Sequence, residues 1–414
     1  MTSDSKEILP AKISFFLLYL GGFGITETHS ERRILNLWMV YTVLMVTVGA
    51  ATIGCDLYHE WGSLEGMTYA GITTLVTTII SIKYFTTLMK RPWYVRVMRL
   101  ARDTLWGHAE TDYDKAVMKK CERHALFYVT AFAYLAGSSG VLYIVEPIIY
   151  NSLNNITAPS DRMLIFKIWQ DWPVYETPNF EMVYILQALI TVQLCVLYSC
   201  FESFLVLANT FITGQFSILR YRLEVLYSHQ LIDRITSSYM ESGEMDGEKN
   251  SLAFVSQEFK NCIRQHQFLI SVTEELEGLY TIINLASVLI HSTLICLCGY
   301  QTIMPGNALV RRIKCTVFAA GCISQLFFFS FTCTNLTLGS LTVGDGPYNS
   351  AWYNENSSEK GRSLTKDYSI MIMRAQRPCR LTGGGFFYVT LDTVKSVLTT
   401  AFSYLTLIRQ SSMN

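Results

Sequence analysis

The sequence predicts an all-α membrane protein with seven transmembrane helices, a cytosolic N-terminus, an extracellular C-terminus and a cytosolic helical anchor domain. Half of the 414 residues are hydrophobic and only 16% are charged, whereas a soluble protein usually has about 25% charged residues. The apolar residues gather in long runs, and about 20 such residues are enough to cross a bilayer. The net charge of zero argues against a nucleic-acid partner.

The apolar pattern divides the chain into four segments. Residues 1–33 form a cytosolic segment in which the run 13–23 is too short to span a bilayer, so we expect a short interfacial helix there. Residues 34–341 hold the first six transmembrane helices and their cytosolic extensions. Residues 342–385 form the cytosolic anchor segment, and residues 386–414 hold the seventh helix and a short extracellular tail.

The expected spans are long enough to cross a bilayer, and the fourth is longer than one crossing requires at about 1.5 Å per residue. Apolar residues continue at helical spacing on both sides of the acidic, glycine-containing run 241–249. We therefore expect two long helices that extend into the cytosol and are joined by a mobile loop. The seven expected spans are residues 34–55, 64–88, 125–149, 182–218, 279–304, 315–341 and 386–408.

The orientation follows from the distribution of lysine and arginine between the loops. With a cytosolic N-terminus, the inside segments carry 25 of these residues and the outside segments carry 6. The triplet Asn155-Ile156-Thr157 is a glycosylation sequon and falls in an outside loop under this arrangement. We therefore expect Asn155 to be the glycosylation site.

Motifs of enzymes and metal sites are absent from the sequence, so we expect neither catalytic residues nor a cofactor. It contains no G-x-S-x-G, H-E-x-x-H, P-loop or C-x-x-C motif. The eleven cysteines lie mostly inside apolar segments, as buried, inert thiols do. His291 stands alone in an apolar span, where a packed and hydrogen-bonded histidine is the simplest interpretation.

Two carboxylates in the apolar spans allow a different function. Glu202 and Asp392 could couple an ion or a proton to transport, because ionisable residues inside a membrane are functional candidates. They could equally be structural and pair with lysines such as Lys83 or Lys395. The spans lack paired, Gly/Pro-broken helices in matching halves, which disfavours an inverted-repeat transporter.

A G-protein-coupled receptor is the other seven-helix class that the sequence must be tested against. The third span does not end in Asp-Arg-Tyr, since Asp161-Arg162-Met163 lies in a loop. The sixth span has no Cys-Trp-x-Pro and the last has no Asn-Pro-x-x-Tyr. The charge bias also places the N-terminus on the opposite side, so this class is disfavoured.

The outer halves of four spans predict a site for a small volatile ligand. Small and hydroxyl residues beside aromatic ones leave room for an apolar guest with one or two polar contacts, although small residues also serve tight helix packing. The third span offers such residues on one face at helical spacing, and so does the sixth. The candidate residues are Ile72, Thr73 and Val76 of span two, Ala136, Ser139, Gly140 and Tyr143 of span three, Leu194 and Tyr198 of span four, and Phe318, Gly321, Cys322 and Gln325 of span six.

The last helix is the candidate for a pore. Ser403, Thr406 and Gln410 share one face, and Leu407 lies beside them. Hydroxyl and amide side chains can replace the hydration of an ion, and a ring of leucines can close a pore by dewetting. The alternative is the amphipathic end of an ordinary span. Before this helix, the glycines 383–385 allow a sharp turn.

Three short motifs follow one another near the C-terminus, and together they resemble the signature of insect odorant receptors. The order and placement of the motifs carry the resemblance, and the chain length and span count agree with it. The motifs are Tyr348-x-x-x-Trp352, Arg374-x-Gln376-x-Pro378 and Ser403-Tyr404-x-x-Leu407.

The resemblance implies an odorant-gated, non-selective cation channel subunit in the plasma membrane of olfactory dendrites. In that family the ligand pocket lies in the outer half of the helices, and the last helices of four subunits line the pore. Leu407 matches the aliphatic constriction of the family, whereas Thr406 departs from a neighbouring glutamine. The short second intracellular loop resembles that of a tuning subunit. The resemblance implies that such a subunit forms a heterotetramer with a shared co-receptor, and that membrane lipid surrounds the assembly.

The resemblance also implies that the anchor segment assembles the subunits, through Tyr348, Trp352, Arg374, Gln376 and Pro378. Gustatory receptors, which have the same broad shape, remain an alternative. Their C-terminal signature typically has Thr-Tyr where this chain has Ser403-Tyr404.

Overall fold

The computed structural model describes residues 8–106, 111–153, 159–168, 173–226, 247–303, 309–350 and 359–413, and these residues form a bundle of long helices with one short hairpin. The helices are α1 (Leu9–Leu20), α2 (His29–His59), α3 (Leu64–Met89), α4 (Arg91–Thr104), α5 (Asp112–Leu153), α6 (Asn179–Val225), α8 (Gly247–Ile303), α9 (Leu309–Leu341), α10 (Asp345–Asn349), α11 (Glu359–Ala375) and α12 (Leu391–Met413). Two 3₁₀ turns, η1 (Pro159–Asp161) and η2 (Thr342–Gly344), and the strands β1 (Thr382–Gly383) and β2 (Phe387–Tyr388) complete the described elements.

The predicted all-α membrane architecture is confirmed. In the described part of the chain, six helices are long and apolar enough to cross a membrane, namely α2, α3, α5, α6, α8 and α9. The predicted seventh span corresponds to α12, whose 23 residues reach about 34 Å. This helix begins at Leu391 rather than at Phe386, because Phe387 and Tyr388 pair as a strand with Thr382 and Gly383.

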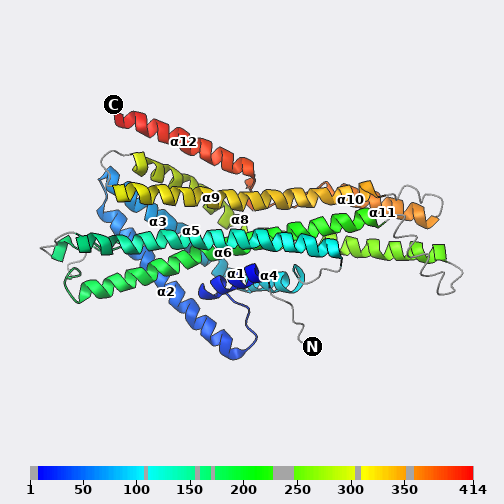
Figure 1. Ribbon diagram of the computed structural model, residues 1–414, viewed down its shortest axis with the longest axis horizontal. Helices are drawn as coiled ribbons and strands as arrows, with labels where there is room; N and C mark the ends of the chain where they lie inside the picture. The colour runs from blue at the N-terminus through cyan, green and yellow to red at the C-terminus, as the bar shows by residue number, and fades with distance from the viewer. Residues whose placement is uncertain are drawn as a thin grey trace.

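Three helices are much longer than a bilayer is thick. The 42, 47 and 57 residues of α5, α6 and α8 correspond to about 63, 70 and 85 Å, against a hydrocarbon core of about 30 Å. Figure 1 shows these helices along the long axis of the molecule, with α11 at one end and the C-terminus toward the other. We call the end with α10 and α11 the anchor end, and the opposite end the pocket end.

Helix α6 is the centre of the bundle. Every residue from Ser199 to Asn209 is buried, and a helix that is buried around its whole circumference must be enclosed by other elements. Helices α5 and α9 pack on it, as do α1, α2, α3 and α8. Residues that line sites on opposite sides of the bundle can therefore lie on this one helix.

The short N-terminal run forms α1, which is a 12-residue helix. Its Ala11, Ser14 and Leu18 are buried in the contact with α6. The chain then enters α2 through a capping box, in which the Thr28 hydroxyl and the Glu31 carboxylate each bind the other residue's backbone N–H.

The glycines before α12 form a sharp turn, as the sequence predicts. Gly384 and Gly385 have φ angles of 63° and 77°, and two successive positive φ values are typical of a tight hairpin turn that favours glycine. The hairpin is fixed to α8, because Glu277 accepts a 2.8 Å hydrogen bond from the backbone N–H of Thr382. The Gly384 N–H also donates to the Thr281 carbonyl at 2.8 Å, so α12 starts from a rigid attachment to α8.

Candidate functional site

A cavity of about 100 Å³ lies toward the pocket end, between α3, α5, α6 and α9. Its walls are predominantly apolar, with a few hydroxyl and thiol groups. A cavity of about 150 Å³ with an apolar lining is known to hold benzene, so this space suits a molecule of only a few heavy atoms. The lining residues are Ile53, Thr73, Val76, Thr77, Ile80, Leu135, Ala136, Ser139, Gly140, Tyr143, Phe166, Thr191, Leu194, Cys195, Tyr198, Phe318, Gly321 and Cys322.

The structure brings together all but two of the residues that the sequence suggested for a ligand site. Ile72 is 2% exposed, but it lies on the face of α3 next to the one that carries Thr73, Val76 and Thr77 to the cavity. Gln325 is in phase with Gly321 and Cys322 but lies about one turn closer to the anchor end, beside His291. These two residues therefore fall outside the lining.

The two glycines in the lining have different roles. A Cβ atom added at Gly140 would lie 2.6 Å from the Cys195 sulfur, so this glycine permits the close approach of α5 and α6. A Cβ added at Gly321 would meet nothing within 4 Å. Gly140 thus supports the packing interpretation of the small residues, whereas Gly321 contributes open volume.

A buried polar network forms the floor of the cavity. Lys83 of α3 makes an ion pair with Glu202 of α6, and the two side chains are 0% and 6% exposed. The Lys83 ammonium also lies 5.4 Å from the ring centroid of Tyr198. The Tyr198 hydroxyl hydrogen-bonds His291 Nε2 at 3.1 Å, and His291 Nδ1 lies 2.6 Å from the Ser287 carbonyl. Of the two alternatives for Glu202, the structure shows the pairing with Lys83, and His291 is hydrogen-bonded as expected.

A second buried cation closes the cavity at the pocket end. Lys314 of α9 pairs with Glu146 of α5 and donates a 2.8 Å hydrogen bond to the Tyr69 hydroxyl of α3. Its ammonium lies 4.1 Å from the ring centroid of Tyr143, a cavity-lining residue. One side chain thus ties together three of the four helices that enclose the cavity.

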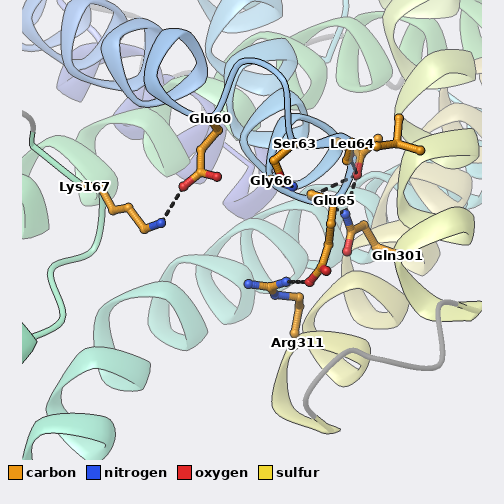
Figure 2. Close-up of polar contacts among 9 residues, drawn as sticks. Glu60, Ser63, Leu64, Glu65, Gly66, Lys167, Gln301 and Arg311 are labelled. Atoms are coloured by element: carbon orange, nitrogen blue, oxygen red, sulfur yellow. Dashed lines mark hydrogen bonds and ion pairs between the residues drawn. The ribbon is translucent and has the colours of Figure 1, made fainter.

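Further polar contacts lie beyond Lys314 at the pocket end, and Figure 2 shows them. Arg311 pairs with Glu65, so α9 is held to the start of α3. Gln301 of α8 donates a 2.9 Å hydrogen bond to the Glu65 carbonyl. Lys167 pairs with Glu60, which follows α2. The helix ends around the cavity mouth are therefore cross-linked by charge.

One lining residue, Phe166, comes from a loop in which no sequence pattern pointed to a ligand site. Phe166 is held by a reciprocal pair of hydrogen bonds, in which its N–H donates to Gln187 Oε1 at 3.1 Å and Gln187 Nε2 donates to its carbonyl at 2.8 Å. The sequence also missed lining residues inside the helices. Spacings of three and four residues from Thr73 identify Thr77 and Ile80, and the same spacing from Leu194 and Tyr198 identifies Thr191 and Cys195.

The candidate pore residues lie on a face of α12 that the rest of the chain leaves open. Val394, Val397 and Ala401 are buried where α12 packs along α8 and α9, on one side of the bundle in Figure 1. Leu407 is 62% exposed, and Ser403, Thr406 and Gln410 are exposed as well. Their roles in a pore stay predictions.

The candidate assembly residues are also at the surface of the anchor end. Tyr348 is 74% exposed, Arg374 and Gln376 are exposed, and Pro378 is half-buried. Helix α11 is attached through its other face, where the buried Tyr368 stacks on Phe259 of α8 with ring centroids 4.1 Å apart. Trp352 and the glycosylation candidate Asn155 lie outside the described residues.

Within the described residues, no group of three or more His, Cys, Asp or Glu side chains is arranged to hold a metal ion. All eleven cysteines are free, and seven of them are buried.

A family model described as 7tm Odorant receptor matches residues 64–402 of this chain. The chain is 23% identical to Odorant receptor Or2 of Anopheles gambiae over 365 residues, which cover 86% of this chain and 87% of that protein. It is 22% identical to Odorant receptor 10 of Aedes albopictus over 375 residues, which cover 89% and 91% of the two chains.

The fold is similar to that of a solved structure. The insect olfactory receptor OR5 from Machilis hrabei in complex with eugenol matches with a TM-score of 0.79 at 13% sequence identity, over 97% of both chains. Another structure of the same receptor matches with a TM-score of 0.76 at 12% sequence identity, also over 97% of both chains.

We expect the removal of one partner of the buried ion pair to destabilise the receptor. Lys83→Met should lower the free energy of unfolding by about 3–5 kcal/mol, because it leaves the Glu202 carboxylate buried without a partner. The double variant Lys83→Met/Glu202→Gln should regain most of that stability, since no buried charge remains. Heating the purified receptor in detergent and measuring the remaining folded fraction by size-exclusion chromatography gives the stability of each variant. A double variant no more stable than the single variant would contradict this account of the pair.

Proposed function

Because this chain belongs to the 7tm odorant receptor family, we propose that it is the odorant-binding subunit of an odorant-gated, non-selective cation channel that assembles with a co-receptor as a heterotetramer. The observation that carries the proposal is the apolar cavity between α3, α5, α6 and α9. Its size and lining suit a volatile, and ion pairs close it at both ends. The chain is a multi-pass membrane receptor, and we place it in the plasma membrane of olfactory dendrites.

The polar atoms of the cavity favour a ligand with a hydrogen-bond donor. The hydroxyls of Thr73, Thr77 and Thr191 donate to carbonyls of their own helices, so their oxygens are available to a ligand only as acceptors. A small alcohol or phenol can donate to such an oxygen while its hydrocarbon part fills the apolar space. We therefore propose compact hydroxylated volatiles as the ligand class.

Helix α8 provides a direct connection from the cavity floor to the proposed pore helix. Its His291 contacts the lining residue Tyr198, and between one and two turns further along the helix α8 contacts α12. There the Cys296 thiol donates to the Ala401 carbonyl at 3.7 Å. Leu405 packs over Gly299, where an added Cβ would lie 3.1 Å from a leucine methyl carbon. A ligand that displaces Tyr198 would shift α8 and with it α12.

Ligand binding opens such a channel only if the open state binds the ligand better than the closed state. We propose that expansion of the small cavity supplies this difference. The exposed faces of α12 from four subunits would surround the ion path, with Leu407 at the constriction.

The ion pair argues against the alternative of a carboxylate-coupled transporter. A coupling carboxylate must bind and release its ion or proton, whereas Glu202 is held by the Lys83 ammonium in the structure. The gustatory alternative is less well supported, because the family model and the curated relatives that match are odorant receptors.

The proposal predicts an odorant-evoked cation current. Cells that express this chain together with an insect odorant co-receptor should respond to members of a broad panel of volatiles, because both subunits are needed for the pore. Whole-cell recording measures the response, with the co-receptor alone as the control. Uptake of a tracer without any current, at confirmed surface expression, would favour a transporter instead.

Filling the cavity should weaken the response. Gly321→Leu places a side chain in open space inside the cavity, so the receptor should fold while the half-maximal ligand concentration rises at least about tenfold, or about 1.4 kcal/mol. Gly137→Leu is the matched control. A Cβ atom added at Gly137 on α5 would also meet nothing within 4 Å, but Gly137 does not line the cavity. Equal dose–response curves for the two variants would mean that the ligand binds elsewhere.

The gate assignment predicts a leak. Leu407→Ala should raise the basal current of the assembled channel roughly twofold or more, because a smaller apolar ring is easier to wet. Leu289→Ala is the control, since Leu289 is a comparably exposed leucine on α8. Unchanged leak and gating in Leu407→Ala would exclude this residue as the constriction.

A further inference from the structure

A second hollow lies far from the ligand cavity, in a groove between α5, α6 and α9 toward the anchor end. Its volume is about 500 Å³. On α5 the groove is centred about 18 residues from the cavity, or about 27 Å along the helix axis, so the two sites are separate. The groove residues are Tyr113, Val117, Lys120, Cys121, His124, Tyr128, Thr210, Thr213, Gly214, Ser217, Phe331, Thr332, Asn335, Leu338, Gly339 and Thr342.

The close packing of the helices defines the groove. A Cβ added at Gly214 would lie 2.5 Å from the Cys121 sulfur, and one added at Gly339 would lie 3.1 Å from a Thr213 methyl carbon. The absence of side chains at these glycines allows the three backbones to approach one another. The residues that line the groove then recur at spacings of three and four along each helix.

Positive charge marks the groove. Its lining includes Lys120 and His124, which are both exposed, and among the described residues it includes no carboxylate. Lys119 and Arg123 neighbour them on α5, and they too are exposed. This stretch belongs to the segment 89–124, which carries nine lysine and arginine residues and which the charge distribution assigns to the cytosolic side.

The hydroxyl groups of the groove are oriented as acceptors. Thr213 and Ser217 donate to the carbonyls four residues earlier on α6, and Thr210 does the same. Thr332 donates to the Phe329 carbonyl on α9. Because each hydroxyl has a single hydrogen, these oxygens can only accept a hydrogen bond from a bound molecule.

The groove becomes more apolar toward the middle of the bundle. Tyr128 and Phe331 line it there, and Phe328 packs against Tyr128 with ring centroids 5.4 Å apart. Phe127 continues this surface and is 57% exposed. A molecule in the groove therefore meets a lysine ammonium, an imidazole and hydroxyl groups at one end and aromatic rings at the other.

We infer that this groove binds an anionic phospholipid of the inner leaflet whose head group carries hydrogen-bond donors, such as phosphatidylserine. The phosphate lies by Lys120 and His124, the ammonium donates to the hydroxyl oxygens of α6, and an acyl chain lies along the aromatic surface. Basic pockets between transmembrane helices on the cytoplasmic side are suited to lipid head groups of this kind. The charge complementarity and the change from polar to apolar lining select a lipid over a soluble anion.

Native mass spectrometry of the purified full-length receptor, titrated with single lipids, tests the inference. Phosphatidylserine should bind at least about fivefold more tightly than phosphatidylcholine, since one basic residue near an anionic lipid is worth about 1 kcal/mol. Phosphatidic acid, which has the charge without the ammonium, should bind more weakly than phosphatidylserine. Lys120→Gln/His124→Gln should lower the affinity for phosphatidylserine at least about fivefold, to the level of phosphatidylcholine. Both positions are exposed, so folding should be preserved.

Lys115→Gln is the matched control. Lys115 lies on α5 outside the groove and pairs with Asp112, so its loss should leave lipid binding unchanged. An equal effect of this variant, or equal affinity for phosphatidylserine and phosphatidylcholine, would overturn the inference. If soluble glycerophosphoserine displaced phosphatidylserine at a concentration equal to that of the lipid, the groove would be a site for a soluble phosphate compound and not for a lipid. Displacement of the lipid on self-association would assign the groove to a second copy of the chain.

Discussion

The ion pair between Lys83 and Glu202 is the constraint on which the arrangement of the bundle depends. Two charges in an apolar interior are tolerated only when they are paired and well placed, so α3 and α6 must meet at this level. Tyr198 lies within reach of the lysine and carries the network to His291 of α8. The pair therefore fixes the depth of the cavity floor and the position of the helix that contacts α12.

The two ends of the bundle are built differently. Ion pairs from several helix ends cross-link the pocket end around an apolar space, whereas the anchor end is made of helices that continue well beyond the thickness of a bilayer. Helix α8 extends through both parts and carries the attachment of α12 through Glu277. Packed contacts on this one helix therefore connect the floor of the cavity to α12.

Much of the fold was predictable because it follows from hydropathy and helical spacing. The spans, the length of the fourth one and the turn at Gly384 all have local signals in the sequence. The start of α12 was not predictable, since the apolar residues Phe387 and Tyr388 belong to a hairpin whose contacts lie in α8. Helical spacing predicted which residues share a face, but it could not show which face of each helix points into the cavity. Spacing could not decide that Ile72 faces the core, or that a loop residue, Phe166, covers the space.

The most direct test of the account is a cryo-electron microscopy structure of the assembled receptor, with and without a volatile that activates it. The account predicts density for the volatile between α3, α5, α6 and α9, together with an outward displacement of α12 at Leu407 relative to the ligand-free state. Density for the volatile at another place, with this cavity unchanged while the pore is open, would contradict it.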